Sequence, residues 1–250
     1  MSYKNIFLLF VGIISITLCY AQTDDKIVID ENIQLLHLQD SVFVHITFDE
    51  LENFGRFSSN GLVIIRNGHA LMIDTPMDNE KTEKLTSYIQ NSFSAKVEKL
   101  IACHFHNDCL GGVSFLKSIG VESIANCMTI DKCKELGIPE PSTAFTDSLI
   151  SDFYGEPIEC RYFGAGHTFD NITVWLPTEK ILFGGCLVKS ANSPNLGNLS
   201  DAVVEDWETT VREVKTKYPD AKIIVPGHGA LGGPELLSHT IDLVAIEKNK

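Results

Sequence analysis

The stretch VEKLIACHFHNDCLGG, residues 97–112, runs from an apolar segment directly into two histidines and an aspartate. His104 and His106 are two positions apart, which in extended backbone places both imidazoles on one side, and Asp108 continues that side. Three such polar groups after a buried strand are costly to bury together unless a ligand binds them. Imidazole and carboxylate are common zinc ligands, so this stretch predicts a metal site at the end of a strand.

Three further side chains of the ligand type stand in matching places along the chain. His167 follows an apolar run that ends at Phe163, Cys186 ends the run ILFGGC, and His228 lies in the run VPGHG. Glycines beside each of them allow the backbone to turn sharply after a strand. Six candidate ligands at one edge are enough for two zinc ions that each keep an open position for water.

The rest of the chain alternates short apolar runs with helical stretches, twice over. The patterns predict helices over 79–93, from about 111, and over 129–136, 203–218 and 234–246. They also predict a hairpin over 61–73 that turns at Arg66-Asn67-Gly68. This order indicates an α/β fold with two sheets packed face to face and helices outside. No linker separates the halves, so we expect residues 22–250 to form one domain.

Charge and the first residues indicate where the protein works. The chain has 20 Lys+Arg against 33 Asp+Glu, a formal charge of −13, which argues against a nucleic-acid or anionic-membrane partner. Residues 1–21 read as a secretory signal, with Lys4 before an apolar run that is too short to span a bilayer. Its removal would take one Lys and no acidic residue, leaving −14. The sequence therefore predicts a periplasmic protein without stable membrane insertion.

The order of the six candidate ligands, with the motif H-x-H-x-D first, resembles that of class B metallo-β-lactamases of the first subclass. The resemblance covers nearly the whole chain after the signal, from about Val28 to the final helix. It implies the four-layer αββα sandwich of that superfamily, with two mixed sheets and helices outside. Cys109 stands where many superfamily hydrolases place a metal-binding histidine, which favours lactamases over thioesterase-like or nuclease-like relatives.

The resemblance also implies how the ligands divide between two zinc ions per chain. The first ion would be held by His104, His106 and His167, and the second by Asp108, Cys186 and His228. Asp74 corresponds to the acid that orients ligands and hydrogen bonds near the metals.

Further residues are implied to contact the substrate. Lys189 would attract the substrate carboxylate, and Asn198 would lie near the carbonyl oxygen of the lactam, so both join Asp108 as candidate catalytic residues. A flap over about residues 49–59 would close over the substrate, with Phe54 and Phe57 covering its ring.

The implied function is hydrolysis of β-lactam antibiotics, including penicillins, cephalosporins and carbapenems, which confers antibiotic resistance. A zinc-bound hydroxide would attack the lactam carbonyl, and the small-molecule β-lactam would be the partner of a monomeric enzyme. Two alternatives stay open. One is another hydrolase of the same superfamily that acts on a thioester, lactone or phosphoester, and the other is a non-catalytic zinc-binding protein. Against the latter, a closed structural site would use four protein ligands around one ion.

Overall fold

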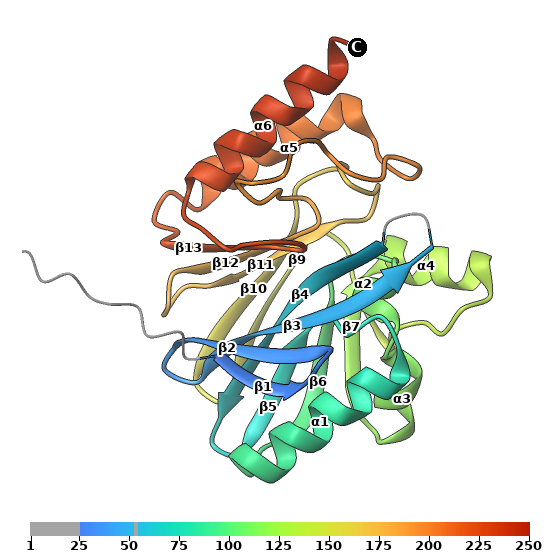
Figure 1. The fold of residues 1–250 in the computed structure, drawn as a ribbon, viewed down its shortest axis with the longest axis vertical. Helices are drawn as coiled ribbons and strands as arrows, with labels where there is room; N and C mark the ends of the chain where they lie inside the picture. The colour runs from blue at the N-terminus through green and yellow to red at the C-terminus, as the bar shows by residue number, and fades with distance from the viewer. Residues whose placement is uncertain (1–25, 53–54) are drawn as a thin grey trace, which may run out of the picture.

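Two β-sheets packed face to face form the centre of the protein, and helices cover both outer faces (Figure 1). The structure is a computed structural model that describes residues 26–52 and 55–250. The expected signal segment over 1–21 lies outside the described residues. The α/β fold with the four layers αββα, two mixed sheets between outer helices, is confirmed.

The first sheet has eight strands that follow one another in space in chain order. They are β1 (Lys26–Asp30), β2 (Ile33–Gln39), β3 (Val42–Leu51), β4 (Gly55–Arg66), β5 (His69–Ile73), β6 (Lys96–Ala102), β7 (Glu122–Asn126) and β8 (Thr143–Phe145). Neighbours from β1 to β5 are antiparallel, and those from β5 to β8 are parallel. The parallel half therefore delivers the carboxyl end of β6 to one edge of the sheet.

The second sheet has five strands in the order β13-β12-β11-β10-β9. They are β9 (Ser148–Phe153), β10 (Glu156–Tyr162), β11 (Ile172–Leu176), β12 (Ile181–Gly185) and β13 (Ile223–Pro226). Only β12 and β13 are parallel neighbours, so their carboxyl ends lie side by side. This pairing brings the residues after two distant strands to one place.

The helices divide between the two outer faces. The eight-stranded sheet is accompanied by α1 (Asn79–Phe93), α2 (Asn107–Leu110), α3 (Val113–Ser118) and α4 (Cys127–Leu136), and the five-stranded sheet by α5 (Val204–Lys217) and α6 (Glu235–Lys248). The side chain of Asp78 caps α1 by accepting a bond of 2.7 Å from the Lys81 amide. Apolar residues such as Trp207 on α5 and Leu237 on α6 fill the space under the second sheet.

The sequence patterns predicted the first long helix and the hairpin turn correctly. The helix over 79–93 has the expected bounds, and the hairpin turn falls at Asn67 and Gly68, between β4 and β5. The helix expected from about 111 is instead two short helices, α2 and α3, separated by Gly111 and Gly112. The break falls at Gly112, whose φ of −97° and ψ of 2° leave the helical region. A Cβ on Gly111 would lie 2.1 Å from the Met77 carbonyl oxygen, so only glycine fits where these two backbones meet.

Candidate metal centre

Four segments that follow strands of both sheets deliver the candidate ligands to one edge. His104 and His106 follow β6, and His167 lies in the loop after β10. Cys186 follows β12, and His228 follows the neighbouring strand β13. The ligands therefore converge because the two sheets end together, although they span the chain from β6 to β13.

The backbone around Asp108 differs in one respect from the extended arrangement that we expected. His106 is extended, with φ −75° and ψ 163°, but it is the residue that caps α2, and Asp108 already lies in that helix. The turn still brings an Asp108 carboxylate oxygen to within 3.5 Å of Nε2 of His104. The motif thus works as a strand end joined to a helix start rather than as one extended segment.

Three histidine rings surround one point. The ring centroids of His104 and His106 are 4.7 Å apart, and those of His104 and His167 are 5.0 Å apart. The third pair, His106 and His167, is 5.2 Å apart. Nε2 of His104 and Nδ1 of His106 lie only 3.1 Å from each other, so both can face one ion.

The other three side chains form a second cluster beside the first. Sγ of Cys186 lies 3.2 Å from Oδ2 of Asp108 and 3.4 Å from Nε2 of His228. Oδ2 of Asp108 is also 3.2 Å from Nε2 of His228. A Cβ on Gly227 would lie 2.4 Å from Sγ of Cys186, so only glycine lets the turn before His228 approach the thiol this closely.

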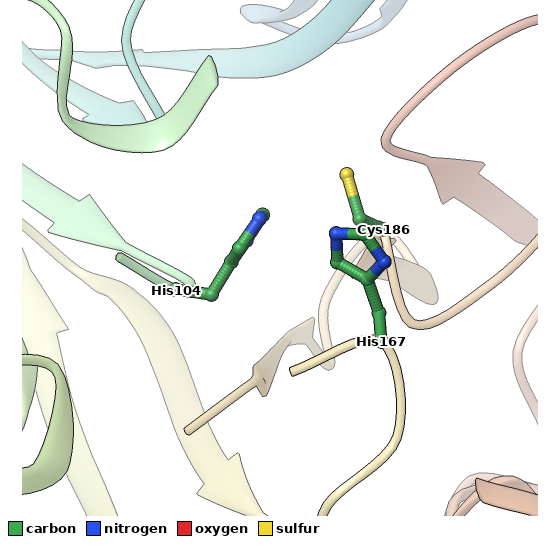
Figure 2. Close-up of side chains that lie close together, drawn as sticks. All are labelled: His104, His167 and Cys186. Carbon is green, nitrogen blue, oxygen red and sulfur yellow. The ribbon is translucent and has the colours of Figure 1, made fainter. Parts of the chain in front are cut away.

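These atoms make the donor groups that zinc prefers. Three sets have all their ligand atoms within 4.8 Å of one another: His104 with His167 and Cys186, His104 with His106 and Asp108, and Asp108 with Cys186 and His228. Figure 2 shows His104 approaching from one side, with His167 and Cys186 on the other. Nδ1 of His167 and Oδ1 of Asp108 are buried and have no hydrogen bond within the described ranges. Nitrogen, carboxylate and thiolate donors left open in this way fit two zinc ions.

Burial and neighbouring charges shift the pKa values of these donors in different directions. Burial lowers the pKa of His104 to about 3, so its ring is neutral and has a lone pair for a metal. Burial opposes ionisation of Asp108, but neighbouring His104 and His228 outweigh it and hold its pKa well below the usual range. Burial raises the pKa of Cys186 to about 11, so a metal must displace the thiol proton when it binds.

Asp74 is hydrogen-bonded to the backbone next to the first candidate ligand. It follows β5 with φ 58°, and its buried Oδ1 accepts a bond of 2.7 Å from the amide of Cys103, next to His104. Burial raises the pKa of Asp74 to about 7, although the bond from Cys103 and a bond with Cys109 act in the opposite direction. The orienting role expected for this acid stays a prediction.

Two contacts of the histidines were not predicted from the sequence. Sγ of Cys109 lies 3.0 Å from Nδ1 of His104, and Oδ2 of Asp201 lies 3.0 Å from Nε2 of His106. Both partners occupy the nitrogen that faces away from the neighbouring ligands, which fixes the ring orientation. The position of Cys109 directly after the motif was a signal for its contact, whereas nothing in the loop sequence pointed to Asp201.

Lys189 and Asn198 lie in different environments. Lys189 is almost buried, with Nζ 5.1 Å from the centre of the Trp207 ring, and burial lowers its pKa. Asn198 is exposed, and its Oδ1 accepts a bond of 3.1 Å from the Ser200 amide. The substrate contacts expected for both residues stay predictions.

The expected flap corresponds to the hairpin of β3 and β4. The ring of Phe57 lies 6.0 Å from that of His228, so this aromatic side chain borders the second cluster. Phe54 lies outside the described residues. Of the two predicted covering residues, Phe57 is therefore placed beside the candidate centre.

The remaining structure adds two findings. The six cysteines from Cys103 to Cys186 are all free thiols. Within the described ranges, no helix is both long and apolar enough to cross a membrane.

Comparison with known proteins agrees with the geometry. The metallo-beta-lactamase superfamily profile matches residues 54–228. A metallo-beta-lactamase type 2 of Bacteroides fragilis is 46% identical over 216 residues, covering 86% of this chain and 87% of the relative. One from Bacillus cereus is 36% identical over 242 residues, covering 94% and 92%.

Solved structures give the same result. A metallo-beta-lactamase from Pontibacter korlensis superposes with a TM-score of 0.83 at 33% identity, covering 85% of this chain and 99% of that one. VMB-1 superposes with a TM-score of 0.84 at 36% identity, covering 88% and 99%. The chain therefore belongs to the metallo-β-lactamase superfamily, and within it to the class B enzymes of the first subclass.

Proposed function

We propose that this enzyme opens the ring of penicillins, cephalosporins and carbapenems, and that it uses two zinc ions. His104, His106 and His167 would hold the first ion, and Asp108, Cys186 and His228 the second. The observation that carries the proposal is the meeting of a three-histidine cluster and an Asp-Cys-His cluster at one strand edge. A purely structural zinc site would use four ligands around one ion.

Zinc, when bound, supplies Lewis-acid chemistry and lowers the pKa of water toward neutrality. The chain's own part is to orient the histidine rings and to select which ring nitrogen faces the metal. The carbonyl oxygen of Ser58 lies 2.8 Å from Nδ1 of His228 and can only accept, so Nδ1 keeps its proton. Nε2 of His228 is therefore the nitrogen left for a metal. Asp201 selects Nδ1 of His106 in the same way.

Other residues would bind and orient the substrate. The ammonium of Lys189 would supply a positive charge near the second cluster and attract a substrate carboxylate. Burial lowers the pKa of Lys189, and its electrostatic interactions with Cys186 and Asp108 act in the opposite direction. Asn198 would donate from Nδ2 to the lactam carbonyl, while its Oδ1 keeps the bond that it accepts from the Ser200 amide. Phe57 would cover the apolar part of the ring beside His228.

We infer that the protein acts in the periplasm as a monomer formed by one domain over residues 22–250. Support comes from the charged and apolar pattern of residues 1–21, which fits a cleaved signal. The curated relatives are bacterial proteins of similar length, since they are covered to 87% and 92%. N-terminal sequencing of protein isolated from a periplasmic fraction would test the cleavage after Ala21.

The proposal is tested by imipenem hydrolysis with the mature protein, with a chelator, and with zinc restored. We expect turnover that the chelator abolishes and that about two equivalents of zinc per chain restore. A thioester, a lactone and a phosphodiester serve as competing substrates in the same assay. Faster hydrolysis of any of these, or imipenem turnover that the chelator leaves unchanged, would defeat the proposed function.

A further inference from the structure

A buried asparagine of the first sheet forms hydrogen bonds to the turn that carries His228. Asn60 lies on β4, opposite Ile46 of β3, and only 4% of it is exposed. Its backbone amide donates a bond of 2.8 Å to the carbonyl oxygen of Gly227, in the second sheet's last loop. The residue therefore lies where the two sheets meet at the metal edge.

The side chain of Asn60 makes two more bonds to the same turn. Its Nδ2 donates to the carbonyl oxygen of Pro226 and to that of Gly229, both at 2.9 Å. Both partners are carbonyls that can only accept, so the amide can face them only with its NH2 group. Three bonds from one residue thus hold the backbone on both sides of His228.

The same strand also holds the His228 ring. The carbonyl oxygen of Ser58, two residues before Asn60, accepts from Nδ1 of His228 at 2.8 Å. Residues 58–60 therefore fix both the backbone and the ring of this ligand. The His228 side chain itself is 41% exposed, so little packing would replace these bonds if they were lost.

A second buried asparagine holds the first cluster in a comparable way. Nδ2 of Asn171 donates to the carbonyl oxygen of Gly164 at 2.9 Å, and its Oδ1 accepts from the Thr168 amide at 3.0 Å. These bonds bracket the loop of His167. Each asparagine therefore serves one cluster, which offers a matched comparison.

We propose that Asn60 is a positioning residue that sets the affinity of the Asp108-Cys186-His228 site for its metal, with little effect on the three-histidine site. The inference rests on the proposed function for the assignment of His228. Replacement of a residue that orients a metal ligand typically lowers metal affinity about 10- to 100-fold. Asn60→Asp keeps the shape but places an acceptor against two carbonyl oxygens.

The test is a titration of the metal-free full protein with Co²⁺, followed by absorption. The Cys186 thiolate gives a sulfur-to-cobalt band that reports the second site alone, while the cobalt d–d bands also report the three-histidine site. For Asn60→Asp we expect the sulfur band to need about 10 to 100 times more free Co²⁺ than in the wild type. The d–d bands of the three-histidine site should appear at wild-type concentrations.

Matched variants complete the design. Asn171→Asp should weaken the three-histidine site and leave the sulfur band at its wild-type position. Asn126→Asp changes a third buried asparagine, whose side chain bonds to the Thr146 carbonyl and the Met128 amide rather than to a loop that carries a ligand, and should alter neither site. If Asn60→Asp fails to fold by circular dichroism, Asn60→Ala, which removes the donors without adding an acceptor, decides in its place.

The outcomes separate this inference from the proposed function. A sulfur band at wild-type Co²⁺ in the Asn60 variant overturns the inference, and so does an equal loss at both sites, which would indicate a general structural role. A wild-type protein without any sulfur band overturns the proposed assignment of Cys186 instead.

Discussion

Nε2 of His106 lies 3.0 Å from Oδ2 of Asp201, although 95 positions separate the two residues. A carboxylate can only accept, so Nε2 carries the ring proton and Nδ1 keeps the lone pair that faces His104. The bond from His106 also lowers the pKa of Asp201, which keeps the carboxylate charged. The loop before α5 therefore selects the tautomer of a candidate ligand that follows β6.

Asp201→Ala should weaken zinc binding at the three-histidine site by about 10- to 100-fold, because the His106 ring loses the acceptor that orients it. Asp201→Asn should lose less, since its amide oxygen can still accept. Competition with a chromophoric chelator measures the affinity. Glu205→Ala, a change of a nearby exposed acid, is the control. Wild-type zinc affinity in Asp201→Ala would contradict the assigned role.

Lys189→Ala should raise KM for β-lactams that bear a carboxylate by about 10- to 100-fold, because a bond to a charged group contributes about 1.5–3 kcal/mol. The effect on kcat should be smaller, since the charge binds substrate rather than reacting atoms. Steady-state kinetics of the variant provide the measurement. Lys134→Ala on α4, whose side chain is 61% exposed, should behave as the wild type. Equal KM values would remove the role of Lys189.

Much of the fold could be predicted because its signals are local. The α1 helix over 79–93 has an apolar stripe at Leu85 and Ile89, and the Asn67-Gly68 turn is typical of a hairpin. The short edge strand β8, over Thr143–Phe145, has two exposed residues among three and no alternation that would indicate it. Its pairing with β7 depends on tertiary contacts.

Some residues of the candidate site could be predicted from local sequence, and others could not. Its six ligand-type residues could be found because each lies in the short segment that follows an apolar strand. Asp201 and Asn60 could not, because their roles depend on bonds that join segments 95 and 166 positions apart. Polar residues in a loop or strand have many ordinary uses, so only the folded chain shows which ligand each one holds.

Arg66 joins the two sheets through a buried ionic group. Its guanidinium contacts Oε2 of Glu156 at 2.5 Å and also contacts Glu179, and both glutamate side chains are at most 2% exposed. Arg66→Ala should lower the free energy of unfolding by about 3–5 kcal/mol, because two buried carboxylates would lose their cation. Urea unfolding of the zinc-loaded protein measures the loss.

Glu179→Gln is the matched variant for this group. Burial and then the charge of Glu156 raise the pKa of Glu179, so its negative charge is unfavourable in the folded state. We therefore expect Glu179→Gln to change the free energy of unfolding far less than Arg66→Ala. Equal losses in the two variants would show that packing, rather than charge, explains the effect of Arg66.

His45 is a buried histidine whose second ring nitrogen has no hydrogen-bond partner among the described residues. It lies on β3, where its Nε2 is 3.1 Å from the Asp74 carbonyl oxygen, and a Cβ on Gly61 would lie 2.0 Å from the same nitrogen. Nδ1 is buried, and no described residue bonds to it. Burial lowers the pKa of His45 to about 4, although the bonds to Asp74 and Ile73 act in the opposite direction.

This shift predicts a loss of stability in acid. The folded pKa is below the unfolded value of about 6.5, so the unfolded state binds the proton first and stability falls as the pH drops from 6.5 toward 4. At pH 5 the lowered pKa of His45 reduces the free energy of unfolding by about 2 kcal/mol. Urea unfolding at pH 7 and pH 5 should show a smaller pH effect in His45→Gln than in the wild type, whereas His239→Gln on α6 should keep the wild-type difference. If His45→Gln kept it as well, the acid sensitivity would have to come from other groups.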